Sequence, residues 1–272
     1  MKNRYFKEII KLILFKVLSN KNGYADLSVR SGIAKGVILR LDLRLEGSYW
    51  LGNYDQWIFN SVPFREIIQP GQVAWDCGTY VGYYTAVFRT LVGDSGRVIG
   101  FEASNDTYKR VKQIPSLNKW DNVFIHNYAV GPDHTTLKFV NNLGASNGPL
   151  SLGKEYKEDI NDLRYEEVIS CGIDELVYEK GIPPADFIKF DLESGEEYAL
   201  HNGQRFFTEK RPIILLELHS QRAKDAAGHF FERYKYVAFL MDDILERKSP
   251  LRSIQDFDKI DNVPHMVYCI PE

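Results

Sequence analysis

Apolar runs alternate with helix-length intervals along most of the chain, and this pattern predicts an α/β fold. The predicted strands of the central sheet are residues 73–77, 97–102, 123–128, 186–191, 212–218, 235–240 and 265–270. Helices are predicted over residues 82–92, 105–118, 196–207 and 222–232. Strands that are apolar throughout are buried on both faces, so the pattern indicates a mostly parallel sheet with helices on both faces.

The first 70 residues follow a different pattern. Residues 36–45 alternate strictly, with leucines on one face and charged side chains on the other, which predicts a half-buried strand. Glu46-Gly47-Ser48 is expected to turn the chain into a short second strand at residues 49–51. A helix from Trp57 to about Ile68 should follow, ended by Pro70-Gly71. We therefore predict an N-terminal helix and hairpin extension over residues 1–70 and an α/β domain over residues 71–272.

The extension begins with a basic, apolar segment, residues 2–18, that is typical of a helix. It is too short and too interrupted to span a bilayer, which needs roughly 20 apolar residues. Lys11 and Lys16 also interrupt any signal-peptide core, and no small-residue cleavage site follows. Two alternatives stay open: the helix packs on the domain or on a second subunit of a homo-oligomer, or it lies on an anionic membrane surface as a peripheral contact.

Residues 131–172 interrupt the alternation of strands and helices. Residues 135–140 and 167–170 are expected to pair as strands, and the segment 141–149 between them is rich in small, polar and turn-forming residues. Inserts of this length are usually functional or disordered. We interpret the insert as a mobile cover over the edge of the ligand site, with solvent-exposed decoration as the alternative.

Charge and cysteine content narrow the class of protein. The 272 residues carry a formal net charge of −3, so there is no overall basic field and nucleic acid is not expected as a partner. Cys77, Cys171 and Cys269 are far apart and odd in number, with no metal spacing and no disulfide framework. This usage fits a reducing compartment, so we expect a cytoplasmic protein, with surface association to a membrane left open.

A glycine-containing turn follows the first predicted strand of the sheet. The spacing is acid-x-G-x-x-x-G, in Asp76, Gly78 and Gly82, and the next strand ends in Glu102. Glycine lets the backbone turn tightly and approach a ligand, and the helix that follows presents unpaired N–H groups. Ligands bind at the carboxyl ends of the strands in such sheets, where Glu102 can accept both hydroxyls of a ribose.

The turn favours a nucleoside cofactor without a pyrophosphate. A dinucleotide fold expects G-x-G-x-x-G, but Tyr80 occupies the second glycine position, which disfavours a nicotinamide-dependent oxidoreductase. S-adenosylmethionine has an ammonium group for Asp76, a thioether that can lie against Gly78 and a ribose for Glu102. The residues predicted to contact this cofactor are Asp76, Gly78, Thr79, Tyr80, Gly82, Tyr84, Glu102, Ala103, Ser104, Tyr128, Ala129 and Asp191.

Six segments resemble the FkbM family of S-adenosylmethionine-dependent methyltransferases, in the family's order. They are D-C-G-T-Y-V-G-Y-Y-T (76–85), V-I-G-F-E (98–102), H-N-Y-A-V-G (126–131), I-D-E-L (173–176), D-F-I-K-F-D-L-E-S-G-E (186–196) and R-P-I-I-L-L-E-L-H (211–219). The resemblance implies a class I methyltransferase domain: a Rossmann-like, seven-stranded sheet whose last strand is antiparallel. It also implies methylation of a hydroxyl on a sugar, glycan or secondary metabolite.

The chain departs from the usual pattern of that family at three places. Thr79-Tyr80 stands where Ala-Asn is usual, Ala103 where Pro is usual, and Asp191-Leu-Glu-Ser-Gly-Glu196 where D-V-E-G-A-E is usual. The acidic residues are retained, so cofactor binding is expected. Tyr80 and Ser194 lie where the pocket would be shaped, and they leave open the alternative of a binding or assembly protein that keeps the fold without turnover.

Acidic residues and a histidine follow two neighbouring predicted strands. Asp191 and Glu193 come after one strand, and Glu217 and His219 end the next, so both pairs should project near the transferred methyl group. We predict these four as the catalytic residues, with His219 favoured as general base and a carboxylate as the alternative.

The same four residues could chemically hold a metal, but neither the spacing nor the resemblance requires one, so none is predicted. Glu193 and Glu196 could instead bind backbone N–H groups of the next helix.

Overall fold

The computed structural model describes residues 17–141, 148–149, 164–240, 251–257 and 265–272. The helix predicted over residues 2–18 lies outside these residues except for its last two positions, which are helical and exposed. Most of the turn-rich segment of the insert also lies outside them. Within the described part of the chain, no helix combines the length and the apolar character needed to cross a bilayer.

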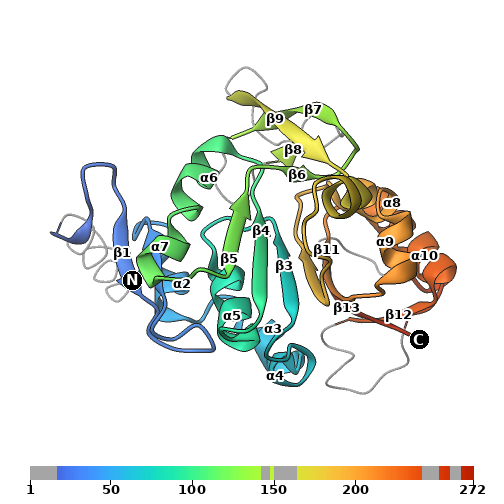
Figure 1. Cartoon of the computed structure of the whole chain (residues 1–272), viewed down its shortest axis with the longest axis horizontal. Helices are drawn as coiled ribbons and strands as arrows, with labels where there is room; N and C mark the ends of the chain where they lie inside the picture. Colours follow the sequence, from blue (N-terminus) through green and yellow to red (C-terminus); the bar gives the residue numbers. More distant parts are fainter. Residues whose placement is uncertain (1–16, 142–147, 150–163, 241–250, 258–264) are drawn as a thin grey trace, which may run out of the picture.

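A seven-stranded sheet forms the centre of the molecule, in the order β12-β13-β11-β10-β3-β4-β5 (Figure 1). Its strands are β3 (Val73–Cys77), β4 (Arg97–Phe101), β5 (Val123–His126), β10 (Phe187–Phe190), β11 (Ile213–Leu218), β12 (Tyr236–Leu240) and β13 (His265–Pro271). β13 is antiparallel to both of its neighbours, and the ladders among β11, β10, β3, β4 and β5 are parallel. The predicted Rossmann-like sheet with an antiparallel last strand is confirmed.

Alternate residues of these strands enter two separate hydrophobic clusters, one on each face of the sheet. Trp75, Ile188 and Ile214 belong to a cluster that includes side chains of α8 (Glu196–His201), α9 (Gln204–Glu209) and α10 (Gln221–Tyr234). Ala74, Phe187 and Leu215 belong to the other, which includes α5 (Tyr83–Val92), α7 (Ile114–Asn118) and the N-terminal segment. Helices therefore cover both faces, as the fully apolar strands require.

The N-terminal segment does not form the predicted hairpin. β2 (Ile38–Leu41) pairs antiparallel with β1 (Ala25–Ser28), whereas α2 (Gly47–Leu51) is a helix, so the second strand predicted at residues 49–51 is wrong. The strand ends at Leu41 although the apolar alternation continues to residue 45. It ends there because Asp42 accepts hydrogen bonds from the Arg44 backbone and side chain and closes a turn. Leu45 consequently points outward and is 77% exposed.

Three predicted helices are each interrupted. The helix predicted over residues 196–207 is divided into α8 and α9, with Asn202 and Gly203 between them. The helix predicted over residues 57–68 is divided into α3 (Gln56–Ser61) and α4 (Phe64–Ile67). Pro63 lies between the two helices and has no backbone N–H to donate, so it cannot extend α3. The helix predicted over residues 105–118 is divided into α6 (Asn105–Val111) and α7. Further short helical elements are η4 (Glu175–Glu179), which is a single π-helical turn, and α12 (Ile254–Phe257).

The insert forms a second sheet of four strands in the order β6-β9-β7-β8, at the top of the view in Figure 1. These strands are β6 (Ala129–Val130), β7 (Thr135–Val140), β8 (Gly148–Pro149) and β9 (Tyr165–Cys171). The predicted pairing of residues 135–140 with 167–170 is confirmed, since β7 and β9 are antiparallel with Thr135 opposite Ser170. Leu137, Phe139 and Val168 form a small apolar cluster, against which Ala103 and Ala129 pack.

The buried carboxylate of Glu46 connects the N-terminal segment with α6 and with the turn that follows β3. Arg110 of α6 donates to both oxygens of Glu46, at 2.8 and 2.9 Å, and both side chains are more than nine-tenths buried. The Glu46 carboxylate also accepts hydrogen bonds from the Tyr80 hydroxyl at 2.8 Å and from the Asp42 backbone N–H at 2.7 Å. A single carboxylate therefore satisfies three donors from three parts of the chain.

We predict that Glu46→Ala lowers the free energy of unfolding by about 3–5 kcal/mol, because it leaves the Arg110 guanidinium buried without a counter-charge. Urea unfolding measures the change. The control is Asp106→Asn, which breaks an exposed pair with Lys109 and should cost at most about 1 kcal/mol. Replacing both partners, as Glu46→Gln with Arg110→Met, should cost less than the sum of the single changes. A loss similar to that of Asp106→Asn would show that the pair has no structural role.

Candidate active site

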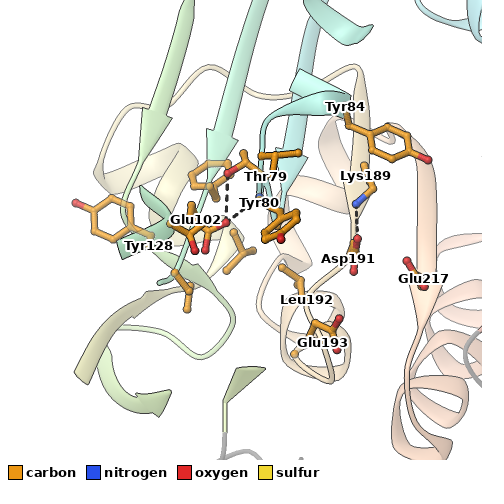
Figure 2. A pocket seen from close by; sticks show the side chains of 18 of the residues that line it. Thr79, Tyr80, Tyr84, Glu102, Tyr128, Lys189, Asp191, Leu192, Glu193 and Glu217 are labelled. Atoms are coloured by element: carbon orange, nitrogen blue, oxygen red, sulfur yellow. Dashed lines mark hydrogen bonds and ion pairs between the residues drawn. The ribbon is translucent and has the colours of Figure 1, made fainter. Parts of the chain in front are cut away.

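A cavity opens at the carboxyl ends of β3, β4, β10 and β11, where a parallel sheet is expected to bind its ligand. About 1060 Å³ of space lies within it when the open solvent at its mouth is included. Figure 2 shows Glu102 and Tyr128 on one side of the turn at Thr79 and Tyr80, and Lys189, Asp191 and Glu217 on the other. The cavity therefore has two chemically different ends.

Gly78 fixes the floor of the cavity. Its φ is +89°, and a Cβ added there would lie 1.9 Å from the backbone oxygen of Asp191. Only glycine permits this approach, which brings the turn after β3 directly against the end of β10. Gly82 has a different role from the one predicted. It precedes α5, and an added Cβ would lie 2.3 Å from Ile114 of α7, so it provides helix packing and does not line the cavity.

Glu102 is held by backbone donors at the first end of the cavity. Its two oxygens accept hydrogen bonds from the N–H groups of Tyr80, at 2.9 Å, and Ser104, at 3.0 Å. The side chain is buried, and burial raises its pKa to about 7 although both hydrogen bonds favour the charged form. Ser104 itself does not line the cavity, because its hydroxyl caps the start of α6 by accepting from Thr107.

Apolar side chains form the wall beside Glu102. Tyr128 and Ala129 line it as predicted, and Leu137 and Phe139 of β7 join them. The insert is therefore part of the cavity wall, as expected for a cover over the ligand edge. The sequence contained no signal for the two β7 side chains beyond their alternation, because their position depends on how the second sheet packs.

Lys189 lines the cavity and is a residue of the candidate site that the sequence analysis missed. It lies in the middle of β10 with only 2% of its surface exposed, and its register partner on β3 is Asp76. Its ammonium group donates to Asp191 Oδ2 at 2.7 Å. Burial opposes its charge, but Asp191, Asp76 and Glu217 outweigh burial and raise its pKa. The available signal was a lysine inside an otherwise apolar strand with an acid two positions later, hence on the same side of the strand.

Asp76 lies behind the cavity wall and does not line it. It is fully buried, and its Oδ2 accepts a hydrogen bond from the Thr85 hydroxyl at 2.6 Å. Burial raises the pKa of Asp76 to about 6, against the opposing effect of Lys189. Tyr84 is also close to this group, since the Lys189 ammonium lies 4.7 Å from its ring centroid. The predicted contact of Asp76 with a cofactor ammonium group would need a bridging water.

The second end of the cavity is a rim of carboxylates around His219. Nε2 of His219 lies 3.7 Å from Asp191 Oδ1, 3.6 Å from Glu217 Oε1 and 4.0 Å from Glu193 Oε1. Asp191, Glu193 and Glu217 line the cavity, whereas His219 lies behind them and is 12% exposed. The structure thus brings together all four residues that the sequence predicted as catalytic.

Glu196 controls the state of the histidine. It is fully buried, and its Oε1 lies 2.8 Å from His219 Nδ1 and accepts a hydrogen bond from the Leu192 backbone at 2.9 Å. Burial opposes the charged imidazole, but the hydrogen bond with Glu196 and the charges of Glu196, Asp191 and Glu193 raise the pKa of His219 to about 9. This raised pKa makes His219 a poor proton acceptor, and it favours a carboxylate over His219 as general base. Burial and the charge of Asp191 raise the pKa of Glu217 to about 7.

Tyrosines from the N-terminal segment close the cavity between its two ends. Tyr49 and Tyr54 line it, with ring centroids 4.1 Å apart, and Tyr49 also contacts the Tyr80 ring at 6.1 Å. Tyr49 also belongs to the hydrophobic core between the N-terminal segment and the sheet, and Tyr54 packs against that core.

A model of the methyltransferase FkbM domain matches residues 76–253. No curated protein matches the chain in sequence. Among solved structures, a methyltransferase FkbM from Methylobacillus flagellatus KT is 13% identical, with a TM-score of 0.46, and the match covers 95% of this chain but only 57% of that one. An O-methyltransferase from Bacillus cereus in complex with SAH is 13% identical over 80% of this chain and 81% of that chain, with a TM-score of 0.41. A SAM-dependent O-methyltransferase from Thermotoga maritima is also 13% identical, over 80% of this chain and 65% of that chain, with a TM-score of 0.41.

Ser194 offers a direct test of the loop that carries Glu193. Its φ is +85°, a left-handed conformation that costs a residue with a side chain roughly 1 kcal/mol. We predict that Ser194→Gly raises the free energy of unfolding by up to about 1 kcal/mol, measured by urea unfolding. Ser116→Gly, in the exposed middle of α7, is the control and should destabilise by about 0.5 kcal/mol. Equal losses for both variants would contradict the left-handed conformation of residue 194.

Proposed function

The chain belongs to the FkbM methyltransferase family, and we propose that it transfers the methyl group of S-adenosylmethionine to a hydroxyl group on a sugar, a glycan or another small metabolite. One observation carries the proposal. A single cavity is lined at one end by the carboxylate of Glu102, and its other end is the rim of carboxylates around His219. The two ends suit the nucleoside of a cofactor and the polar group of an acceptor.

The cofactor end fits a nucleoside well. Glu102 is held in place by the N–H groups of Tyr80 and Ser104, and it still lines the cavity, so its oxygens can accept further hydrogen bonds from a ribose diol. The apolar wall of Ala129, Leu137 and Phe139 suits a purine ring. When bound, S-adenosylmethionine supplies an activated methyl group on a sulfonium centre. A nicotinamide dinucleotide fits less well, because its pyrophosphate would meet a lining that carries four carboxylates, Glu102, Asp191, Glu193 and Glu217.

The acceptor end suits a hydroxyl-bearing molecule. Tyrosine rings present apolar faces with polar tips, on which the C–H face of a sugar ring can pack. The carboxylates of Asp191 and Glu217 can accept hydrogen bonds from acceptor hydroxyls, and one of them can take the proton that leaves the reacting oxygen. The chain's main contribution is to hold acceptor and cofactor in line, because positioning alone supplies much of the rate in such reactions.

Binding of S-adenosylhomocysteine tests the cofactor end. A ribose donates hydrogen bonds, so it needs Glu102 ionised. Above pH 7 the carboxylate is already ionised and affinity should be constant, whereas below pH 7 it must lose a proton and affinity should fall, approaching about tenfold per pH unit. Calorimetric titration between about pH 5.5 and pH 8 measures this dependence.

Glu102→Gln should weaken that binding about tenfold to a hundredfold at pH 8 and remove the pH dependence, because it removes the charge that strengthens the ribose hydrogen bonds. Asp106→Asn, on the exposed side of α6, is the matched control and should change nothing. A folded wild-type protein that does not bind S-adenosylhomocysteine would reject the proposal.

Methyl transfer to a panel of sugars, glycans and polyhydroxylated metabolites tests the acceptor end. Formation of S-adenosylhomocysteine is measured for the wild type and for Glu217→Gln. We expect Glu217→Gln to lower kcat by at least about a hundredfold and to leave S-adenosylhomocysteine affinity unchanged, because the residue lies at the far end of the cavity from Glu102 (Figure 2). Glu209→Gln, on the exposed surface of α9, is the control. Tight cofactor binding with no transfer to any acceptor would favour the non-catalytic alternative.

A further inference from the structure

The donor atoms of the rim surround a small volume. Each distance from His219 Nε2 to the oxygens of Asp191, Glu193 and Glu217 is between 3.6 and 4.0 Å, which is longer than a hydrogen bond. One ligand atom from each of Asp191, Glu217 and His219 lies within 4.8 Å of the other two. Two atoms that each lie about 2.1 Å from a common ion are separated by about 3.0–4.2 Å, depending on the angle. The Nε2–oxygen separations of 3.6–4.0 Å fall within this range, as expected for ligands of one metal ion.

The orientation of the histidine also matches that of a metal ligand. A metal-bound histidine generally donates its other ring nitrogen to a carboxylate, which fixes the ring. Here Nδ1 lies 2.8 Å from Glu196 Oε1, and Nε2 faces the three carboxylates. Asp191 is fixed in the same way: its Oδ2 accepts from Lys189 at 2.7 Å, and its Oδ1 is the oxygen nearest His219.

Glu196 contributes a further observation through its second oxygen. Its side chain is fully buried, its carboxylate is directed at His219, and its Oε2 has no hydrogen-bond partner within the described residues. A buried carboxylate with an unsatisfied oxygen is costly unless positive charge lies nearby. A protonated His219 provides that charge when no metal is bound, and a cation at Nε2 would displace the proton and provide the charge in its place.

We propose that Asp191, Glu217 and His219 bind a divalent metal ion, with Glu193 at the edge of its coordination sphere. A set of one imidazole and two carboxylates suits a first-row transition ion such as Mn²⁺ better than Ca²⁺, which prefers oxygen ligands alone. Three protein ligands leave coordination positions open, and Asp191 and Glu217 line the cavity, so these positions face the acceptor. In that role, which rests on the proposed function, the ion binds the acceptor hydroxyl and makes it more acidic.

Titration with Mn²⁺ tests the site. The full chain is treated with EDTA, desalted and titrated with MnCl₂, while free Mn²⁺ is followed by its electron paramagnetic resonance signal. We expect one tightly bound ion per chain, with coupling to an imidazole nitrogen in the pulsed spectrum of the wild type. This coupling is read without any variant, so it remains decisive if substitutions in the rim unfold the protein.

Variants then assign the ligands. Glu217→Gln and His219→Ala should each weaken Mn²⁺ binding at least about tenfold, and Glu196→Gln should also weaken it, because it removes the charge behind the histidine. His229→Ala, an exposed histidine on α10, is the matched control and should leave binding unchanged. Circular dichroism confirms that each variant is folded.

Three results would overturn the proposal: no binding to the folded wild type, bound Mn²⁺ without nitrogen coupling, or binding that Glu217→Gln and His219→Ala leave unchanged. A parallel titration with S-adenosylhomocysteine separates this proposal from the proposed function. Mn²⁺ binding without S-adenosylhomocysteine binding supports the metal site and rejects the methyltransferase activity, and the reverse result does the opposite.

Discussion

The site depends on the buried charge of Lys189. A lysine in the middle of a central strand is unfavourable unless carboxylates lie beside it, and here Asp76 on β3 and Asp191 at the end of β10 provide them. The same interaction fixes the direction of Asp191, because one of its oxygens is held by the ammonium group and the other faces the cavity rim. A requirement of folding, neutralising Lys189, therefore also positions a carboxylate of the candidate site.

A second set of interactions connects the N-terminal segment to the cofactor end. Tyr80 donates its backbone N–H to Glu102 and its hydroxyl to Glu46. Glu46 in turn forms a buried ion pair with Arg110. The N-terminal segment is therefore part of the site, since it also contributes Tyr49 and Tyr54 to the cavity wall. Whether residues 1–70 form a separate unit stays a prediction, but buried apolar side chains between Val29 and Ile68 share a core with α5 and the sheet.

The strands of the sheet were predictable because both of their faces are buried, so nearly every residue in them is apolar. The rim residues were predictable for a related reason: a polar residue directly after an apolar strand, such as Asp191 or His219, lies at the carboxyl edge of the sheet. What the sequence could not provide was tertiary pairing. Neither the contact between Glu196 and His219 nor the place of Phe139 in the cavity wall has a local signal, because each joins elements far apart in the chain. The hairpin prediction is wrong for a different reason. The local alternation of residues 36–45 predicts a longer strand, but the hydrogen-bonded turn at Asp42 ends the strand.

The two departures from the family pattern that raised doubt about activity affect the site unequally. At position 80 the contact with Glu102 is made by the backbone N–H, so any residue there except proline can donate it. The tyrosine side chain instead replaces a small polar group with an aromatic wall that is attached to Glu46. At position 194 a serine takes up the left-handed conformation that glycine would adopt freely, and the chain still directs Glu193 toward His219. Both departures therefore preserve the positions of the acidic residues and alter the walls around them, which is where differences in acceptor among members of one family should arise.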